Sequence, residues 1–215
     1  MVNFSIAALL AVASPLVGAV NVYDTEFTGE GTFYGPQPSG QGNCALTQPI
    51  PDIYDLGPDY IPIALNHEQY DGSLMCGACI EGEFTGEGLG VFNPEEGQEF
   101  RGYVSDRCPE CKKGDLDFGM SGDGRWNIKW KFVDCERGGS PTFRFEGSNP
   151  WYWKIQPRGM VRPPKKVTIN GATATRSQDN HFVYHSGEPL HEATVRVKML
   201  NKKKKYNMVV TLNNA

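Results

Sequence analysis

Alternating apolar and polar positions mark the clearest secondary-structure element of this chain. In residues 126–133 the side chains of Ile128, Trp130 and Phe132 fall opposite two lysines, which is the period of a strand with one buried face. We expect a short helix within residues 60–70, and no long helical period occurs elsewhere. The 25 Gly and 15 Pro residues suit a chain with many turns, so the pattern predicts an all-β protein.

Two hairpins are predicted near the C-terminus. Strand-like runs at 166–169 and 172–175 flank the dipeptide Asn-Gly, which favours a tight two-residue turn. A second pair of runs, 194–200 and 206–212, is joined across four consecutive lysines. Short strands separated by turn signals indicate a small antiparallel sandwich in this part of the chain.

The first 19 residues have the pattern of a secretory signal. An apolar core from Phe4 to Ala13 precedes small residues at 17–19 that suit cleavage. A membrane anchor is the competing interpretation, but the apolar run is short and Pro15 interrupts it. We therefore expect a secreted, extracellular protein with no later membrane span.

Charge divides the rest of the chain into two parts. Residues 20–139 carry 8 Lys and Arg against 21 Asp and Glu, a net charge of −13, whereas residues 140–215 carry 13 against 4, a net charge of +9. A turn-rich stretch at 136–142 separates them. We expect an acidic first domain over 20–138 and a basic second domain over 142–215, whose opposite charges favour close packing.

All six cysteines lie in the acidic part. In a secreted chain an even number of cysteines predicts three disulfides, whose pairing the sequence leaves open. A zinc site built from two Cys-x-x-Cys pairs is the alternative, but secretion argues against it and two cysteines would be left over. The cysteines are Cys44, Cys76, Cys79, Cys108, Cys111 and Cys135.

Residues 103–119 bring carboxylates together. Asp106, Glu110 and Asp117 lie beside two cysteines, directly after a short strand-like run. Clustered carboxylates on a braced loop serve glycosidic-bond hydrolysis, and they also bind sugar hydroxyls through hydrogen bonds. The segment therefore predicts a polysaccharide site that is either enzymatic or purely binding.

Three consecutive aromatic residues, Trp151, Tyr152 and Trp153, form a second candidate site. Because strand side chains alternate between faces, the three cannot all enter one core, and exposed Trp and Tyr are enriched at binding surfaces. The competing interpretation buries both tryptophans in the core or at the domain junction. We favour a sugar-binding surface, because bulky rings are hard to bury in so small a sandwich.

The lysine run at 202–205 and the basic second half also raise a nucleic-acid interpretation. In a secreted protein, a solvated hairpin tip with attraction for acidic polymers is the better interpretation. We expect no nucleic-acid partner, no membrane partner, no metal and no cofactor, and a monomeric protein.

Several motifs, in order along the chain, resemble the expansin family, specifically microbial and fungal expansin-like proteins. The similarity covers nearly all of the mature chain, and its specificity comes from the order of the motifs rather than from any single one. The motifs lie at 31–35, 76–79, 103–117, 126–130, 146–156 and 180–183.

The resemblance implies a double-psi β-barrel followed by an immunoglobulin-like β-sandwich that binds carbohydrate. It implies a secreted protein that loosens cellulose-containing walls without cutting chains, with Asp117 at the family's essential aspartate position. Xyloglucan and chitin are possible targets besides cellulose. The polysaccharide-contacting residues implied for the barrel groove and for a flat aromatic surface are Thr32, Tyr34, Asp106, Glu110, Asp117, Trp151, Tyr152 and Trp153.

The second domain departs from the family pattern at Asp179. Bacterial members carry the third aromatic residue of the flat surface directly before the motif at 180–183, where this chain has an aspartate. The departure leaves the length of the flat surface open, unless Trp153 substitutes for the missing side chain.

Two alternatives remain beside wall loosening. Small inverting endo-β-1,4-glucanases share the barrel and the acid position, but they need a second carboxylate about 6.5–9.5 Å away as base. In those enzymes the base follows the first-strand aromatic motif, and residues 32–38 contain no carboxylate here. Glu30 could share the face of Thr32 but is out of place. The other alternative is a carbohydrate-binding or defence protein without loosening activity.

Overall fold

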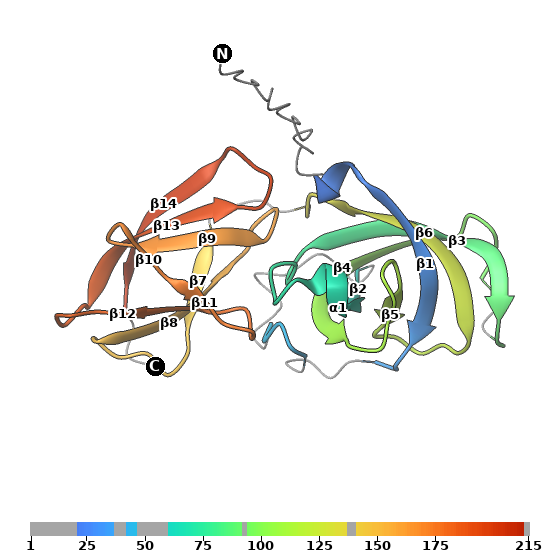
Figure 1. Ribbon diagram of the computed structural model, residues 1–215, viewed down its shortest axis with the longest axis horizontal. Coiled ribbons are helices and arrows are strands. Elements are labelled where there is room, and N and C mark those ends of the chain that lie inside the picture. Colours follow the sequence, from blue (N-terminus) through green and yellow to red (C-terminus); the bar gives the residue numbers. More distant parts are fainter. Residues whose placement is uncertain (1–20, 37–41, 47–59, 92–93, 137–140, 213–215) are drawn as a thin grey trace, which may run out of the picture.

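The computed structural model describes residues 21–36, 42–46, 60–91, 94–136 and 141–212 of the 215-residue chain. Two bodies lie side by side, the first at the right of Figure 1 and the second at the left. In the described residues, fourteen strands accompany one 3-10 helix and one α-helix of a single turn. The predicted all-β class is confirmed.

The first body is a closed barrel with the strand order β1-β5-β2-β4-β3-β6. β1 pairs with β5 and β2 with β4 in parallel, and the other four neighbouring pairs are antiparallel, so the barrel is mixed. A 3-10 helix, η1 (Val22–Asp24), precedes the barrel, and α1 (His67–Tyr70) follows its second strand. The strands are β1 (Glu26–Phe33), β2 (Tyr60–Asn66), β3 (Cys79–Leu89), β4 (Glu99–Cys108), β5 (Leu116–Phe118) and β6 (Arg125–Val133).

The alternation in β6 has the predicted result. Ile128, Trp130 and Phe132 are buried in the barrel core. Lys129 and Lys131 lie on the outer face, where they form salt bridges with glutamates of β3. The sequence period therefore identified both the strand and its buried face.

The helix expected within residues 60–70 is mostly a strand. Tyr60–Asn66 form β2, and only His67–Tyr70 is helical. Because β2 lies between β4 and β5 and its second half is buried, the strand lacks the alternation that would identify it. Asn66 starts the helix, since its side chain accepts a hydrogen bond from the N–H of Gln69 at 3.0 Å.

The second body is a β-sandwich of two four-stranded sheets, β10-β9-β13-β14 and β11-β12-β8-β7. Both predicted hairpins occur, and the first turns at Asn170 and Gly171, whose φ angles are 47° and 86°. The strands are β7 (Thr142–Phe145), β8 (Tyr152–Arg158), β9 (Pro164–Ile169), β10 (Ala172–Thr173), β11 (Thr175–Arg176), β12 (Phe182–His185), β13 (Glu192–Met199) and β14 (Lys205–Thr211).

The two bodies meet in an interface with apolar and charged parts. Leu200, which follows β13 of the sandwich, is 6% exposed and belongs to the buried core of the barrel. Asp134, which follows β6 of the barrel, forms salt bridges with Arg162 and Lys202 of the sandwich. Acidic and basic halves thus attract each other at the junction. Lys202 is an interface residue, so the solvated tip predicted for the lysine run does not include it.

Three disulfides use all six cysteines, as their even number predicts. Cys44 pairs with Cys76 and Cys79 with Cys135, so neighbouring cysteines of one Cys-x-x-Cys motif belong to different disulfides. The other motif closes on itself as Cys108–Cys111. The pairing leaves the zinc alternative without thiolates, because each sulfur is in a disulfide.

Two of the expectations concern residues outside the described part. The signal at 1–19 lies outside it altogether, and the turn-rich stretch at 136–142 lies outside it at residues 137–140. Among the described residues, no helix has both the length and the apolar character that a membrane span needs.

Candidate functional site

The barrel surface carries a row of side chains that are aligned across four strands. Thr32 of β1 is in register with Asp117 of β5, Asp117 with Ala64 of β2, and Ala64 with Asp106 of β4. Residues in register on neighbouring strands point to the same face. The row Thr32–Asp117–Ala64–Asp106, called the groove row below, therefore places two carboxylates on either side of a small residue, with backbones roughly 10 Å apart.

Asp117 is the carboxylate at the centre of this row. It is half-buried, and its Oδ1 accepts a hydrogen bond of 2.7 Å from the Oγ1 of Thr32. Burial raises the pKa of Asp117, the bond from Thr32 opposes that rise, and the nearby carboxylates of Glu110 and Asp106 add to it. The side chain therefore takes up a proton more readily than an exposed aspartate does.

Tyr34 directly follows β1 and lies close to the two aspartates. Burial raises the pKa of Tyr34, the carboxylates of Asp106 and Asp117 raise it further, and a hydrogen bond with Ser105 opposes them. The phenol is 39% exposed and remains neutral. Its neutral hydroxyl lies close to both groove carboxylates.

Glu110 lies in the turn that the Cys108–Cys111 disulfide closes. With Thr32 and Asp117 it lines an open pocket of about 390 Å³. The predicted barrel residues Thr32, Tyr34, Asp106, Glu110 and Asp117 are thus brought to one region, although they come from four different parts of the chain.

Glu30 lines the same pocket, two residues before Thr32 on β1. Its carboxylate forms a salt bridge of 2.7 Å with Arg125 of β6. Among the described residues, Glu30 is the one carboxylate of β1 on this pocket, and it is committed to a cation. A hydrolytic base must instead accept a proton from water, which a guanidinium partner disfavours.

The turn before β5 is fixed to β1 by a buried carboxylate. Asp115 is 7% exposed and accepts hydrogen bonds of 2.9 Å from the backbone N–H groups of Glu30 and Lys112. Strand β1 crosses this turn at Gly29, where a Cβ atom would lie 2.3 Å from the backbone of Gly114. Asp115 is therefore a structural carboxylate that fixes where Asp117 emerges two residues later.

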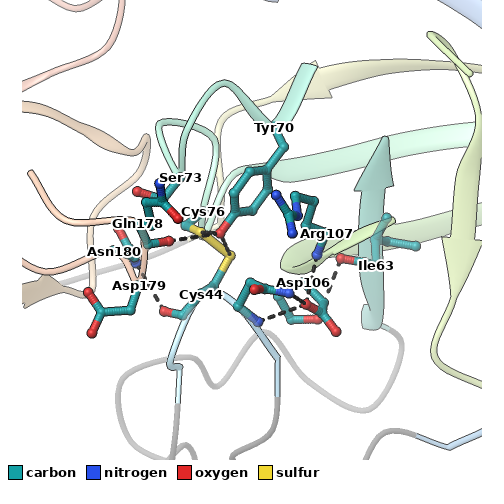
Figure 2. The surroundings of a disulfide bond; sticks show 12 residues. Cys44, Ile63, Tyr70, Ser73, Cys76, Asp106, Arg107, Gln178, Asp179 and Asn180 are labelled. Carbon is teal, nitrogen blue, oxygen red and sulfur yellow. Dashed lines mark hydrogen bonds between the residues drawn. A yellow bond between two sulfur atoms is a disulfide. The ribbon is translucent and has the colours of Figure 1, made fainter. Parts of the chain in front are cut away.

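Asp106 is held by a residue that the sequence did not point to. Its Oδ1 accepts hydrogen bonds from the backbone N–H and the side-chain amide of Asn43, at 2.7 and 2.6 Å. A third bond of 2.8 Å comes from the N–H of Arg107. The residue after Asn43, Cys44, is joined to Cys76 by a disulfide, which Figure 2 shows near Asp106. No local motif marks Asn43, because its partner is 63 residues away.

The sandwich presents an exposed aromatic pair. Trp151 is 56% exposed and lies in a turn where the side chain of Asn149 accepts hydrogen bonds from the N–H groups of Trp151 and Tyr152, at 2.9 and 3.1 Å. Tyr152 is partly exposed, and its ring contacts the ring of His185 with 5.2 Å between centroids. Trp151 and Tyr152, called the aromatic pair below, are thus neighbouring aromatic side chains that are open to solvent.

Trp153 is not part of this exposed pair, so the prediction that it contacts polysaccharide is wrong. Its side chain is 0% exposed and packs edge-on against Phe145, and its indole N–H donates to the carbonyl of Leu190 at 3.0 Å. Tyr152 begins β8, so alternation turns Trp153 inward. Trp151 escapes that alternation because it precedes the strand in an Asn-Pro turn.

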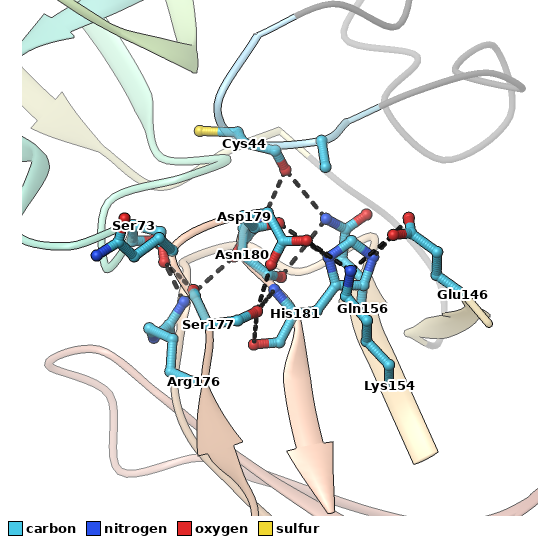
Figure 3. A network of polar contacts seen from close by, with 12 residues as sticks. Cys44, Ser73, Glu146, Lys154, Gln156, Arg176, Ser177, Asp179, Asn180 and His181 are labelled. Carbon is cyan, nitrogen blue, oxygen red and sulfur yellow. Dashed lines mark hydrogen bonds and ion pairs between the residues drawn. The ribbon is translucent and has the colours of Figure 1, made fainter. Parts of the chain in front are cut away.

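A charged cluster lies between the aromatic pair and the barrel. The Nζ of Lys154 is 2.6 Å from Glu146 and 2.7 Å from Asp179 (Figure 3). The buried ring of His181 lies against both acids, with its Nδ1 bonded to the carbonyl of Asp179 at 2.9 Å. These four residues are called the Lys154 cluster below. Asp179 is an ion-pair partner and does not supply a third aromatic face.

Comparison with known proteins defines the family of the chain. No family model matches it. The curated protein Expansin-YoaJ from Bacillus subtilis (strain 168) is 30% identical over 174 residues, which cover 75% of this chain and 68% of that protein. The chain belongs to the expansin family.

Solved structures share the fold of this expansin. A variant of the Clavibacter michiganensis expansin in complex with cellohexaose matches with a TM-score of 0.68 and 20% identity, over 89% of this chain and 93% of that one. The apo form of the Clavibacter protein matches with a TM-score of 0.65 and 19% identity. The predicted family and the predicted double-psi barrel with a β-sandwich are confirmed, and the roles of the individual site residues stay predictions.

Acid should destabilise this expansin through the Lys154 cluster. Burial opposes ionisation of Asp179, but hydrogen bonds from Lys154 and Ser177 outweigh it and lower its pKa to about 2. The bond from Lys154 lowers the pKa of Glu146, and burial lowers the pKa of His181. In each case the unfolded chain binds the proton more readily than the folded protein. Stability is therefore lost as pH falls, first below about pH 6.5 through His181 and then between about pH 5 and pH 2 through the acids.

We expect the thermal unfolding midpoint to fall between pH 7 and pH 3, and Asp179→Asn to flatten that fall. The side chain of Asp179 is 40% exposed, so its share at pH 7 is about 1 kcal/mol after solvent screening. Scanning calorimetry across this pH range measures the effect, with the exposed Glu95→Gln as control. A pH slope equal to that of the wild type in Asp179→Asn would contradict the assignment.

Proposed function

We propose that this expansin is a secreted, non-hydrolytic protein that binds wall polysaccharide, cellulose first, and loosens the non-covalent contacts between glucan chains. The groove row carries the proposal. Asp117 and Asp106 offer carboxylate oxygens on one face, while Glu30, the first-strand carboxylate on the pocket, is paired with Arg125. Such a surface accepts hydrogen bonds from sugar hydroxyls without an activated water.

The proposed mechanism is competition for hydroxyl groups. A neutral hydrogen bond between glucan chains contributes about 0.5–1.5 kcal/mol net, and bonds to an ionised carboxylate are stronger. Several acceptors aligned on one face therefore offset the adhesion of a chain segment to its neighbour. In this mechanism Asp117 and Asp106 accept hydrogen bonds from the sugar hydroxyls, beside the neutral hydroxyl of Tyr34. That the Clavibacter relative is described in complex with cellohexaose supports a glucan as ligand.

Adsorption is assigned to the sandwich. The aromatic pair lies on its outer face, where a flat ring covers the apolar C–H face of a sugar. On the other sheet, Lys166, Lys198 and Lys205 are in register across three strands. Within the described residues none of these lysines forms a salt bridge. Like charges directly opposite one another repel, so this ladder favours binding of acidic wall polymers.

An extracellular location is part of the proposal. Three disulfides support it, because disulfides persist in oxidising compartments.

The test is to measure weakening of cellulose paper under load, release of reducing ends from amorphous cellulose, and cellulose binding on the same protein. We expect weakening and binding without reducing ends above background. Turnover that Asp117→Asn abolishes would establish the endoglucanase alternative, with Glu30 released from Arg125 as its base. Binding without weakening would leave the carbohydrate-binding or defence alternative.

A further inference from the structure

The described stretch of residues 42–46 contacts both the groove row and the sandwich, and we call it the coupling loop. We propose that Asn43 is a positioning residue for Asp106, and that the sandwich holds Asn43 in place through the coupling loop. The part that concerns loosening rests on the proposed function of the groove row. The positional part stands on contacts alone.

Within the described part of the chain, the hydrogen bonds that Asn43 and Arg107 donate to Asp106 all go to Oδ1. The backbone N–H and side-chain amide of Asn43 both donate to Oδ1, together with the N–H of Arg107. A carboxylate oxygen has two lone pairs, so Oδ1 is fully occupied and a sugar hydroxyl is directed to Oδ2. These donors also hold the carboxylate at one χ angle, as a preorganised acceptor requires.

The coupling loop also forms a hydrogen bond to a β-bulge in β4, directly before Asp106. In the pairing of β2 with β4, Val104 faces Ile63 and Asp106 faces Ala64, so Ser105 is an extra residue on β4. Such a bulge re-aims the side chain that follows it. The carbonyl of Ser105 accepts a hydrogen bond of 3.2 Å from the N–H of Cys44.

Cys44 is the point at which the attachments meet. Its N–H binds the bulge, and its Sγ is in the disulfide to Cys76, with 5.4 Å between the Cα atoms. The segment around Cys76 is itself tied to the sandwich, because the hydroxyl of Ser73 donates to the carbonyl of Ser177 at 2.9 Å. Figure 2 shows Cys44, Cys76 and Tyr70 grouped between Asp106 and residues 178–180 of the sandwich.

The carbonyl groups of the coupling loop complete the connection to the sandwich (Figure 3). The carbonyl of Cys44 accepts hydrogen bonds from the side-chain amides of Gln156 at 3.0 Å and Asn180 at 3.4 Å. The carbonyl of Ala45 accepts one from Arg158 at 3.3 Å. Gln156, Arg158 and Asn180 are at most 2% exposed, so the coupling loop supplies hydrogen-bond acceptors to buried donors.

The geometry therefore makes the sandwich part of the groove. Gln156 lies on β8, the strand that begins with Tyr152 of the aromatic pair. A continuous path runs from that strand through the carbonyl of Cys44 to Asn43 and Asp106. Packing of the sandwich against the barrel thus fixes the orientation of the Asp106 carboxylate, and it also fixes the distance between the sandwich and the groove row.

The positional part is tested by ¹⁵N–¹H NMR of the full chain. Asn43→Ala should move the Arg107 amide signal, because Arg107 shares the oxygen that Asn43 releases. Gln156→Ala should move the signals of Asn43 and Arg107 from the other side of the interface. Gln98→Ala, an exposed glutamine of the barrel remote from the loop, is the control. Unchanged Arg107 signals in both variants would overturn the positional part, whether or not the protein loosens walls.

A double-mutant cycle tests the functional part. Asn43→Ala should lower the rate of paper weakening on the order of tenfold, as expected for the loss of a charge-assisted bond. Cellulose binding and the unfolding midpoint should stay near those of the wild type. In the Asp106→Ala background, Asn43→Ala should have no further effect. An equal loss in both backgrounds would show that Asn43 acts independently of Asp106 and would overturn the proposal. A wild-type protein without weakening would overturn the proposed function, and the NMR result would still decide the position of Asn43.

Discussion

Asp117→Asn should reduce the rate of paper weakening at least tenfold while cellulose binding stays within about twofold. The amide keeps the size of the side chain but loses the charge and one acceptor, so the Thr32 bond and the sugar bond compete for a single oxygen. The proposed function assigns adsorption to the aromatic pair on the other body, so we expect it to stay intact. Creep of cellulose paper and a pull-down on the same samples measure the two effects.

Stability separates this loss of function from misfolding. Burial raises the pKa of Asp117, which means that the ionised carboxylate costs stability at neutral pH in the folded protein. Asp117→Asn removes that cost, so its unfolding midpoint should equal or exceed that of the wild type. Asp71→Asn, the same chemical change in the exposed residue after α1, is the matched control. Full weakening activity in Asp117→Asn would exclude the groove row as the site of loosening.

Trp151→Ala should have the largest effect on adsorption. The ring is 56% exposed, and in the proposed complex a flat ligand covers most of that apolar area. Loss of that area corresponds to about 1.5–3 kcal/mol of binding free energy, or roughly a tenfold to hundredfold weaker affinity for cellulose. A binding isotherm on microcrystalline cellulose measures the change, and the unfolding midpoint should move little.

The neighbouring tryptophan supplies the contrast. Trp153→Ala should destabilise the protein by about 3–5 kcal/mol, because Trp153 is 0% exposed in the sandwich core. Tyr206→Ala, a partly exposed aromatic side chain on the opposite sheet, controls for a general loss of surface aromatics. Cellulose affinity that is unchanged in Trp151→Ala, or lowered equally in Tyr206→Ala, would show that adsorption lies elsewhere.

The sequence predicted those parts of the fold that depend on local patterns. The alternation in 126–133 identified β6 and its buried face, and Asn170-Gly171 identified a hairpin. The sequence pattern did not identify β2 as a strand. A strand with neighbours on both sides and a buried second half has no alternation of apolar and polar residues. The pattern failed for Trp153 because the strand begins one residue after Trp151, and strand boundaries depend on the Asn149 turn.

The candidate site was predictable to the extent that the motif order of a family carries it. Thr32 and Asp117 were proposed together, and they form a hydrogen bond between parallel neighbouring strands. Asn43 was missed because nothing in the local sequence distinguishes it from any turn asparagine. The partner of Glu30, Arg125, lies 95 residues away along the chain, so this salt bridge could not be predicted from the local sequence either. Contacts between distant segments are determined by the closed barrel, and the sequence pattern does not encode them locally.

Leu200 limits how far expansins can be treated as interchangeable modules. This side chain comes from the sandwich, yet it completes the core of the barrel. A chimera that joins this barrel to another carbohydrate-binding domain would therefore have an apolar cavity at the domain interface, unless the new domain places a side chain of similar volume there. The barrel and the sandwich should therefore be exchanged together, with the interface between them kept intact.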